Sequence, residues 1–218
     1  MFENHETISI GTLNILESVR LYCPQANVFL SGSAVQFKNE GLPMDECNSF
    51  EVNSQFTISH IQSVYAARYY SAKFALKVYV GYLFNHDSGL RSEQHVDKKI
   101  VCAVQRIASG STEEHQLNNI NMKKEFSFAD DVVEAIWLLV NQDQVYETII
   151  GIGKAYSIQE WIEHSIKKIN IYYEDNISIQ DWFISEYEIL ISNSKIMLDK
   201  GWKPKLNYFL ASRHDDEK

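Results

Sequence analysis

Apolar residues gather in short segments that stand between longer stretches with helical spacing. Segments 27–31, 76–84 and 148–151 are rich in β-branched or aromatic residues, which is typical of strands buried in a sheet. Along the longer stretches, apolar positions recur every three or four residues, as they do on one face of a helix. Strands that alternate with helices in this way predict an α/β fold built on a parallel sheet.

End signals locate the earlier helices. The first is predicted to begin at Thr12, because apolar residues recur at helical spacing after it and Pro24 lies just beyond its end. The second is expected to cover about residues 54–70. The third covers residues 98–109, and Gly110 follows it at the place where a left-handed cap is expected.

Two later helices carry residues that favour a helix N-terminus. Asp130 is expected to cap the fourth helix, and acidic residues in its first turn suit the positive end of the helix dipole. The apolar stripe predicted for this helix consists of Val133, Ile136, Trp137 and Val140. Ser157 and Glu160 form an S-x-x-E capping box at the start of the fifth helix.

Composition narrows the class of protein and the kind of partner. The chain has 218 residues, of which 45% are hydrophobic and 12% aromatic, so it can bury a core, and we expect residues 1–218 to form a single unit. Its formal net charge of −9 argues against a nucleic-acid partner, which would require Lys and Arg concentrated on one face. A small molecule or another protein is the expected partner.

Cysteine usage and hydropathy bear on location. Cys23, Cys47 and Cys102 are too few and too widely spaced for a disulfide framework or a CxxC metal site, so we expect no metal and a reducing cytoplasm. No apolar run reaches the roughly 18 residues that span a bilayer. The opening MFENHETISI also lacks the pattern of a secretory signal, so the expected location is cytoplasmic, away from the membrane.

Several stretches, in order along the chain, resemble one family of sugar-nucleotide enzymes. GTLNILESVR and the following VFLSGS are similar to a helix and a strand of sugar-nucleotide dehydratases and epimerases. Residues 83–100, LFNHDSGLRSEQHVDKKI, resemble the LFNHESPRRGE-x-FV-x-RKI stretch characteristic of GDP-mannose 4,6-dehydratases. Further similar stretches are residues 117–143, IIGIGKAYSIQEWIE and SNSKIMLDKGWKPK. The chain thus resembles the GDP-mannose 4,6-dehydratases of the extended short-chain dehydrogenase/reductase family.

The resemblance implies a partial, N-terminally truncated Rossmann-like parallel sheet with a small C-terminal α/β substrate-binding part. Family members open with a strand, a Gly-rich turn and a helix that hold the dinucleotide pyrophosphate, and no G-x-x-G-x-x-G occurs in this sequence. About residues 1–85 with 128–151 are expected to form the remaining Rossmann part, and about residues 86–127 and 152–212 the substrate-binding part. The family's cofactor, NADP or NAD, is therefore not expected to bind this chain alone.

The resemblance also shows that catalytic positions of the family are altered here. Family members oxidise C4 of the hexose, eliminate water across C5 and C6 and return the hydride to C6, using a tyrosine and a lysine four residues later. In SQFTISH these positions hold Phe56, which has no proton to exchange, and His60, which fits either a base near neutrality or a helix-surface histidine. Ser33 matches the family's hydroxyl-bearing residue, whereas Val35 stands where the acid for elimination is found. We therefore expect no turnover by this chain alone.

Positions that bind ligands in the family are partly kept. Asn85 matches an asparagine that reaches both the nicotinamide side and the phosphates, so it and His60 stand at cofactor-binding positions; Asn85 equally fits a strand-end turn. Arg91 and Lys99 match cationic residues of the family, and Lys124 replaces an arginine, which keeps the charge but loses bidentate geometry. Two interpretations of these cationic residues stay open. They contact a GDP-sugar, or they are ordinary surface charges surrounded by solvent.

Three interpretations of function follow. The first is a dehydratase-like protein that does not turn over by itself. The second is a non-catalytic partner of a full-length dehydratase or of a second copy, because family members associate through helices of this region and an exposed half-sheet edge favours pairing. The third is an active GDP-mannose 4,6-dehydratase or related enzyme completed by another chain, which would still need a replacement for Phe56.

Overall fold

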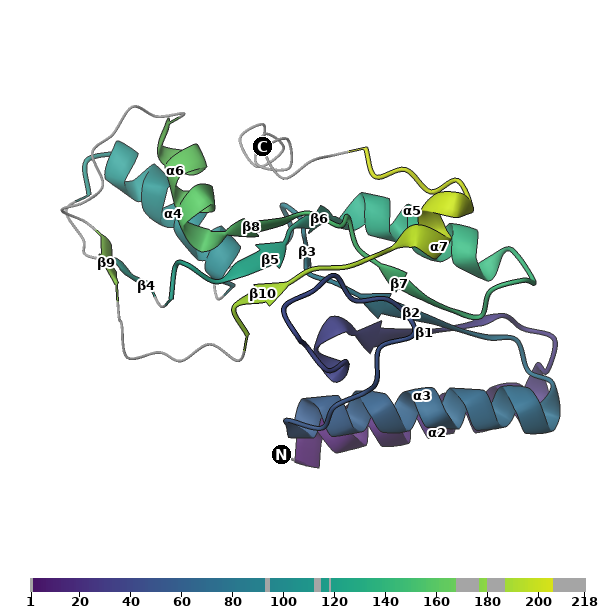
Figure 1. Ribbon diagram of the computed structural model, residues 1–218. Helices are drawn as coiled ribbons and strands as arrows, with labels where there is room; N and C mark the ends of the chain where they lie inside the picture. Colours follow the sequence, from purple (N-terminus) through teal and green to yellow (C-terminus); the bar gives the residue numbers. More distant parts are fainter. Residues whose placement is uncertain are drawn as a thin grey trace.

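Parallel strands form the central sheet of the computed structural model, in the order β1-β2-β7 (Figure 1). They are Val28–Ser33, Val78–Leu83 and Glu147–Ile150. Because all three strands run in the same direction, their carboxyl ends lie at one edge of the sheet. The structure describes residues 2–92, 95–111, 115–117, 119–167, 177–179 and 187–205.

Helices cover both faces of this sheet (Figure 1). On one face lie α2 (Gly11–Tyr22) and α3 (Gln55–Phe74), side by side. The opposite face carries α5 (Ala129–Val140) and α7 (Lys195–Asp199). Short turns of helix complete this part: α1 (Phe2–Asn4) and the π-helical η1 (His5–Ile10) lead into α2, and the 3-10 turn η2 (Ala34–Gln36) follows β1.

Each face of the sheet has its own apolar core. The core beneath α2 and α3 includes Leu16, Val64 and Val80, all buried. The core beneath α5 and α7 includes Leu139 and Ile150. Because the central strands are covered on both faces, their sequences read as nearly continuous apolar runs, and this explains why the sequence pattern located them.

A second, smaller part is built from short strands and two helices. Its main sheet has the order β10-β5-β8, formed by Ile189–Leu190, Lys123–Glu125 and Ala155–Ser157. Two-stranded pairs join β3 (His86–Asp87) to β6 (Ser127–Phe128) and β4 (His115–Leu117) to β9 (Ile177–Ile179). The helices α4 (Val96–Ala108) and α6 (Ile158–Lys167) contact each other. Stacked rings of Phe126 and Trp161, 5.6 Å apart between centroids, lie in the core of this part.

The expected α/β fold with a parallel, Rossmann-like sheet is confirmed, and so are several element ends. Ser157 N–H donates to Glu160 Oε2 (2.6 Å) and Glu160 N–H to Ser157 Oγ (3.0 Å), which is the predicted capping box. Gly110 has a φ of +89°, in the left-handed region, just after α4. The division into a Rossmann part and a substrate-binding part stays a prediction.

One expectation about α5 is wrong, and a second holds only in part. The helix begins at Ala129 after Phe128, which makes no side-chain cap, so Asp130 lies in the first turn instead of capping it. Of the predicted stripe, Ile136 and Val140 pack against the core, but Val133 and Trp137 are 61% and 70% exposed. The residues that face the sheet are Val132, Ala135 and Leu139. Because most residues of this helix are apolar, the helical period fits more than one face and could not select the buried one.

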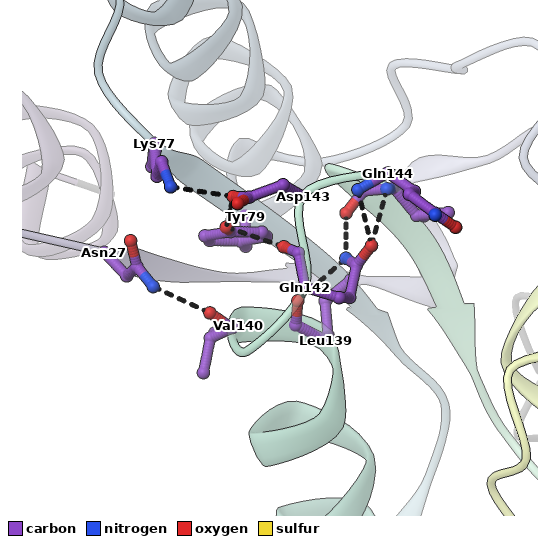
Figure 2. A network of polar contacts seen from close by, with 9 residues as sticks. Asn27, Lys77, Tyr79, Leu139, Val140, Gln142, Asp143 and Gln144 are labelled. Atoms are coloured by element: carbon purple, nitrogen blue, oxygen red, sulfur yellow. Dashed lines mark hydrogen bonds and ion pairs between the residues drawn. The ribbon is translucent and has the colours of Figure 1, made fainter.

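A polar network closes the carboxyl end of α5 (Figure 2). Gln142 Nε2 donates to Leu139 O (2.8 Å), and Asn27 Nδ2 donates to Val140 O (2.8 Å), so the last carbonyls of the helix find donors outside it. Tyr79 OH donates to Gln142 O (2.8 Å) from the neighbouring strand β2. These bonds fix the turn that leads from α5 into β7.

A buried carboxylate joins the second part to the central sheet. Glu125, on β5, is fully buried and accepts backbone hydrogen bonds from Ile152 (2.6 Å), Gly153 (3.1 Å) and Ser192 (2.5 Å). Burial raises the pKa of Glu125 above its ordinary value, while the hydrogen bonds oppose this shift. Gly151 is required beside it, because a Cβ there would lie 2.5 Å from Glu125 Oε2 and from Ser192 Oγ.

Glu125→Ala should lower the free energy of unfolding by about 3 kcal/mol or more, because buried N–H groups would lose their acceptor. Urea unfolding followed by circular dichroism measures the change. Glu163→Ala is the matched control, since Glu163 is an exposed residue of α6, and it should change stability by less than about 0.5 kcal/mol. Equal losses in the two variants would contradict the role given to Glu125.

Candidate functional site

The carboxyl edge of the central sheet gathers the positions expected to carry catalysis. β1 ends at Ser33, β2 ends at Leu83, and Asn85 follows shortly after it. Phe56 and His60 lie in the first turns of α3, which packs against β1. Ligands of open α/β sheets bind in the crevice outside the carboxyl ends of the strands, so this edge is the candidate site.

The start of α3 is fixed by a reciprocal cap. Thr57 N–H donates to Ser54 Oγ (3.2 Å), and Ser54 N–H donates to Thr57 Oγ1 (3.0 Å). Such a cap satisfies backbone donors that a helix start leaves without partners. It places Phe56 in the first turn and His60 one turn later on the same side of the helix.

Phe56 and His60 pack against each other. Their ring centroids lie 4.4 Å apart, with an angle of 62° between the ring planes. Phe56 is 38% exposed, but His60 is only 7% exposed. The interpretation of His60 as a helix-surface histidine is therefore wrong, since the imidazole belongs to the packed interior of this end of the helix.

The environment of His60 favours its neutral form. Burial lowers the pKa of His60 below its ordinary value, and a contact with the backbone of Ser31 works in the opposite direction. Within the described residues, its Nδ1 atom is buried and has no hydrogen-bond partner. Burial therefore disfavours a positive charge on His60, the residue expected at the position of the family's lysine.

Ser33 lies beside an amide that the sequence did not single out. Its N–H donates to Gln36 Oε1 (2.9 Å), and Gln36 is fully buried. Gln36 Nε2 has no hydrogen-bond partner among the described residues. A polar residue in a short turn gives no periodic signal, so Gln36 could not be found from the pattern. Val35 is half-buried and packs against the core, which leaves no acid at that position.

Asn85 connects the central sheet with the second part. Its carbonyl accepts a hydrogen bond from Ser127 N–H (3.0 Å), and Ser127 lies on β6. The side chain of Asn85 is half-buried. Ser127 was not anticipated either, and its Oγ is buried without a hydrogen-bond partner in the part of the chain that the structure describes. This backbone hydrogen bond fits the interpretation of Asn85 as a strand-end turn residue. A contact between its side-chain amide and a ligand stays a prediction.

The cationic positions differ in their exposure. Lys124, on β5, is 9% exposed, and its Nζ lies 4.9 Å from the ring centroid of Phe126. Arg91 forms an ion pair with Asp87, with 3.2 Å between Nε and Oδ1. This pair was not predicted, although the two residues are only four positions apart in the sequence. Lys99 is exposed on α4. The interpretation as solvated surface charge fits Lys99 and is wrong for Lys124.

The arrangement offers cations and amides but no hydroxyl at the proton-transfer position of Phe56.

Across the described ranges, no group of three or more His, Cys, Asp or Glu side chains could hold a metal ion. None of the helices in those ranges has the length and apolar character needed to cross a membrane.

His60 predicts a pH dependence of stability with a defined sign. The pKa of His60 in the folded chain lies below its unfolded value of about 6.5. The neutral imidazole therefore contributes fully to the free energy of unfolding above that pH. This contribution is lost as the pH falls through the folded-state pKa. The stability advantage of the wild type over His60→Gln should therefore shrink between about pH 7.5 and about pH 5. Urea unfolding at the two pH values measures it, and an advantage that is constant or grows towards low pH would contradict the burial of a neutral imidazole.

Comparison with known proteins identifies relatives along almost the entire chain. The family model described as GDP-mannose 4,6 dehydratase matches residues 2–208. GDP-mannose 4,6 dehydratase 1 of Arabidopsis thaliana is 27% identical over 212 residues, which are 93% of this chain and 58% of that protein. GDP-mannose 4,6 dehydratase of Dictyostelium discoideum is 30% identical over 165 residues, 74% of this chain and 46% of that protein. The chain thus spans about half the length of these relatives.

Solved structures agree with the fold. RMD from Pseudomonas aeruginosa, complexed with NADPH, superposes with a TM-score of 0.86 at 18% identity, covering 98% of this chain and 74% of that one. A dTDP-glucose 4,6-dehydratase from Bacillus anthracis, in complex with NAD, gives a TM-score of 0.82 at 18% identity, covering 98% and 70%. On the match of its family model over residues 2–208, the chain belongs to the GDP-mannose 4,6-dehydratase family of extended short-chain dehydrogenases/reductases.

Proposed function

We propose that this chain is a non-catalytic member of its family, which holds a GDP-sugar without dehydrating it when it acts alone. The observation that carries the proposal is the packed pair of Phe56 and His60 at the start of α3. Dehydration begins with removal of a proton from a sugar hydroxyl, and a base must lie within hydrogen-bond reach of that proton. A phenyl ring has no such group, and the neighbouring imidazole is buried against it.

The nearby residues do not replace the missing groups. Val35 has no ionisable atom, and Ser33 keeps a hydroxyl whose ordinary pKa is far too high for a base without an activating partner. The buried carboxylate of Glu125 is held by backbone N–H groups and joins two parts of the fold. Of these three described residues, none supplies a donor and acceptor pair for proton transfer at this edge.

The residues present do not fit the dinucleotide of the related enzymes. A buried, neutral His60 supplies neither the charge nor the reach of a lysine towards a ribose. A backbone cradle for the pyrophosphate requires a Gly-rich turn between a strand and a helix, and this sequence has no G-x-x-G-x-x-G. We therefore derive no hydride transfer for this chain.

The cationic positions support the binding half of the proposal. Lys124 is 9% exposed, so an anion that reaches its ammonium group would contact it away from bulk water. Arg91 is partly buried beside Asp87. The family resemblance implies that the diphosphate of a GDP-sugar is the anion at these positions, so Lys124 is the residue on which we expect binding to depend most.

Titration calorimetry with GDP-mannose tests this expectation. Lys124→Met keeps most of the side-chain volume but removes the charge, and it should weaken binding about tenfold or more, because a charge-assisted hydrogen bond contributes about 1.5 to 3 kcal/mol. Lys123→Met is the matched control, since its neighbour Lys123 is exposed, and its affinity should stay within about twofold of wild type. No binding by the wild type, or equal losses in both variants, would refute the GDP-sugar site.

A second candidate function is that of an associating subunit, either with a full-length dehydratase or with a second copy. Tyr65 and Tyr69 lie one turn apart on α3, and each is 58% exposed. Tyrosine is enriched at protein interfaces, and neighbouring exposed aromatic residues on one helix face mark such surfaces. This observation favours association through α3.

Replacement of both residues, Tyr65→Glu and Tyr69→Glu, should shift the purified chain to a smaller assembly, because two charges would have to be desolvated in the contact. Sedimentation velocity measures the change. Tyr22→Glu is the control, since Tyr22 is 83% exposed at the end of α2 and outside this face. If the wild type sediments as a monomer both alone and with a dehydratase, this candidate function is wrong.

A further inference from the structure

A buried glutamine follows the end of β1. Gln36 closes the 3-10 turn η2 and is fully buried, whereas most glutamines of soluble proteins lie at the surface. Its side-chain oxygen Oε1 accepts a hydrogen bond from Ser33 N–H (2.9 Å). Among the described residues, its amide nitrogen Nε2 is buried and has no hydrogen-bond partner. The amide is therefore only half satisfied, and its one bond goes to the last residue of β1.

Such an amide is a poor choice for stability alone. A buried donor without an acceptor costs free energy, because it loses its hydrogen bonds with water and gains none in return. A methionine has a similar volume and would fill the same space without that cost. Buried polar groups without a partner are rare in folded proteins, and they occur preferentially at functional sites. The presence of Gln36 therefore indicates a role other than packing.

The backbone around Gln36 is held on a second side. Its carbonyl accepts a hydrogen bond from Glu51 N–H (2.9 Å), which lies in the segment that leads to the start of α3. The next residue, Phe37, forms a bridge with Phe50 of the same segment, and their ring centroids lie 5.2 Å apart. Gln36 thus joins the end of β1 to the segment before α3.

The residue before Ser33 leaves room for the amide. A Cβ on Gly32 would lie 3.2 Å from Gln36 Oε1 and 2.6 Å from Cδ1 of the Tyr82 ring. A larger residue at this position would have to displace the amide or the ring. The glycine therefore permits the hydrogen bond between Ser33 and Gln36.

This hydrogen bond fixes the residue that carries the hydroxyl of the candidate site. Ser33 lies at the carboxyl edge of the sheet, where Phe56 stands in the first turn of α3. Its side chain is half-buried, so the hydroxyl is not sealed from a ligand. A group that binds a ligand must be held within a fraction of an ångström by supporting hydrogen bonds. Gln36 supplies such a bond to the peptide from which the Ser33 side chain extends.

We propose that Gln36 is a positioning residue, which holds Ser33 so that its hydroxyl forms a hydrogen bond with the hexose of a bound GDP-sugar. This inference rests on the proposed function, in which the diphosphate contacts Lys124 and the hexose lies near Phe56. Gln36 itself touches no ligand, since it is fully buried. It acts through Ser33, and it contributes to recognition of the sugar but not of the nucleotide.

Titration calorimetry of the full chain with GDP-mannose and, separately, with GDP tests this inference. Gln36→Met keeps the side-chain volume and removes the amide. It should weaken binding of GDP-mannose about fivefold, as expected for the loss of one neutral hydrogen bond, and change binding of GDP by less than about twofold. Its urea unfolding midpoint should equal or exceed that of the wild type, because a buried donor without an acceptor is removed.

A double-mutant cycle shows whether Gln36 acts through Ser33. In the Ser33→Ala background, Gln36→Met should change the affinity for GDP-mannose by less than about twofold, because no hydroxyl is left to position. Gln62→Met is the matched control. Gln62 Oε1 also accepts a hydrogen bond from a serine, Ser9 Oγ (2.9 Å), but on the side of α3 that contacts η1. This control should bind both ligands like the wild type.

Failure of the wild type to bind GDP-mannose would refute the GDP-sugar site and this inference with it. Binding by the wild type together with equal binding by Gln36→Met would overturn the inference alone. Equal losses for GDP and GDP-mannose, or a loss that persists in the Ser33→Ala background, would also overturn it, since Gln36 would then have a structural role only. The two kinds of failure are therefore distinguishable.

Discussion

The parallel pairing of β1 with β2 and of β2 with β7 is the constraint on which the rest of the structure depends. It brings Ser33 and Asn85 to one edge of the sheet, and it requires α3 to cross back over one face with its N-terminus at that same edge. Phe56 and His60 come to the candidate site for this reason. The register therefore determines which side chains meet, whereas the identity of those side chains determines what the site can do.

At this edge, an aromatic ring and a buried imidazole contact each other, since the ring centroids of Phe56 and His60 lie 4.4 Å apart. This contact stabilises the start of α3. In the proposed function, it stands in place of a pair that transfers protons. The second part of the fold is held differently, since the buried carboxylate of Glu125 binds N–H groups from two other segments. Lys124 precedes it in β5, so the same strand carries both the internal junction and the buried cation.

Much of the fold was accessible from the sequence because its signals are local. Strands covered on both faces give apolar runs, and the box of Ser157 and Glu160 depends on a four-residue spacing. The buried face of α5 was not accessible, because that helix is apolar nearly all round and only the neighbouring chain around Trp202 decides which flank is covered. Gln36, Ser127 and the burial of His60 and Lys124 depend on contacts between distant segments, which no spacing rule encodes.

Product formation tests the central claim most directly. The purified chain is incubated with saturating GDP-mannose and NADP, and the 4-keto sugar nucleotide is measured by mass spectrometry. We expect no product above the enzyme-free control, because no group at Phe56 can accept the proton of a sugar hydroxyl. Several turnovers per chain would contradict it and would show that His60 or another residue supplies the base.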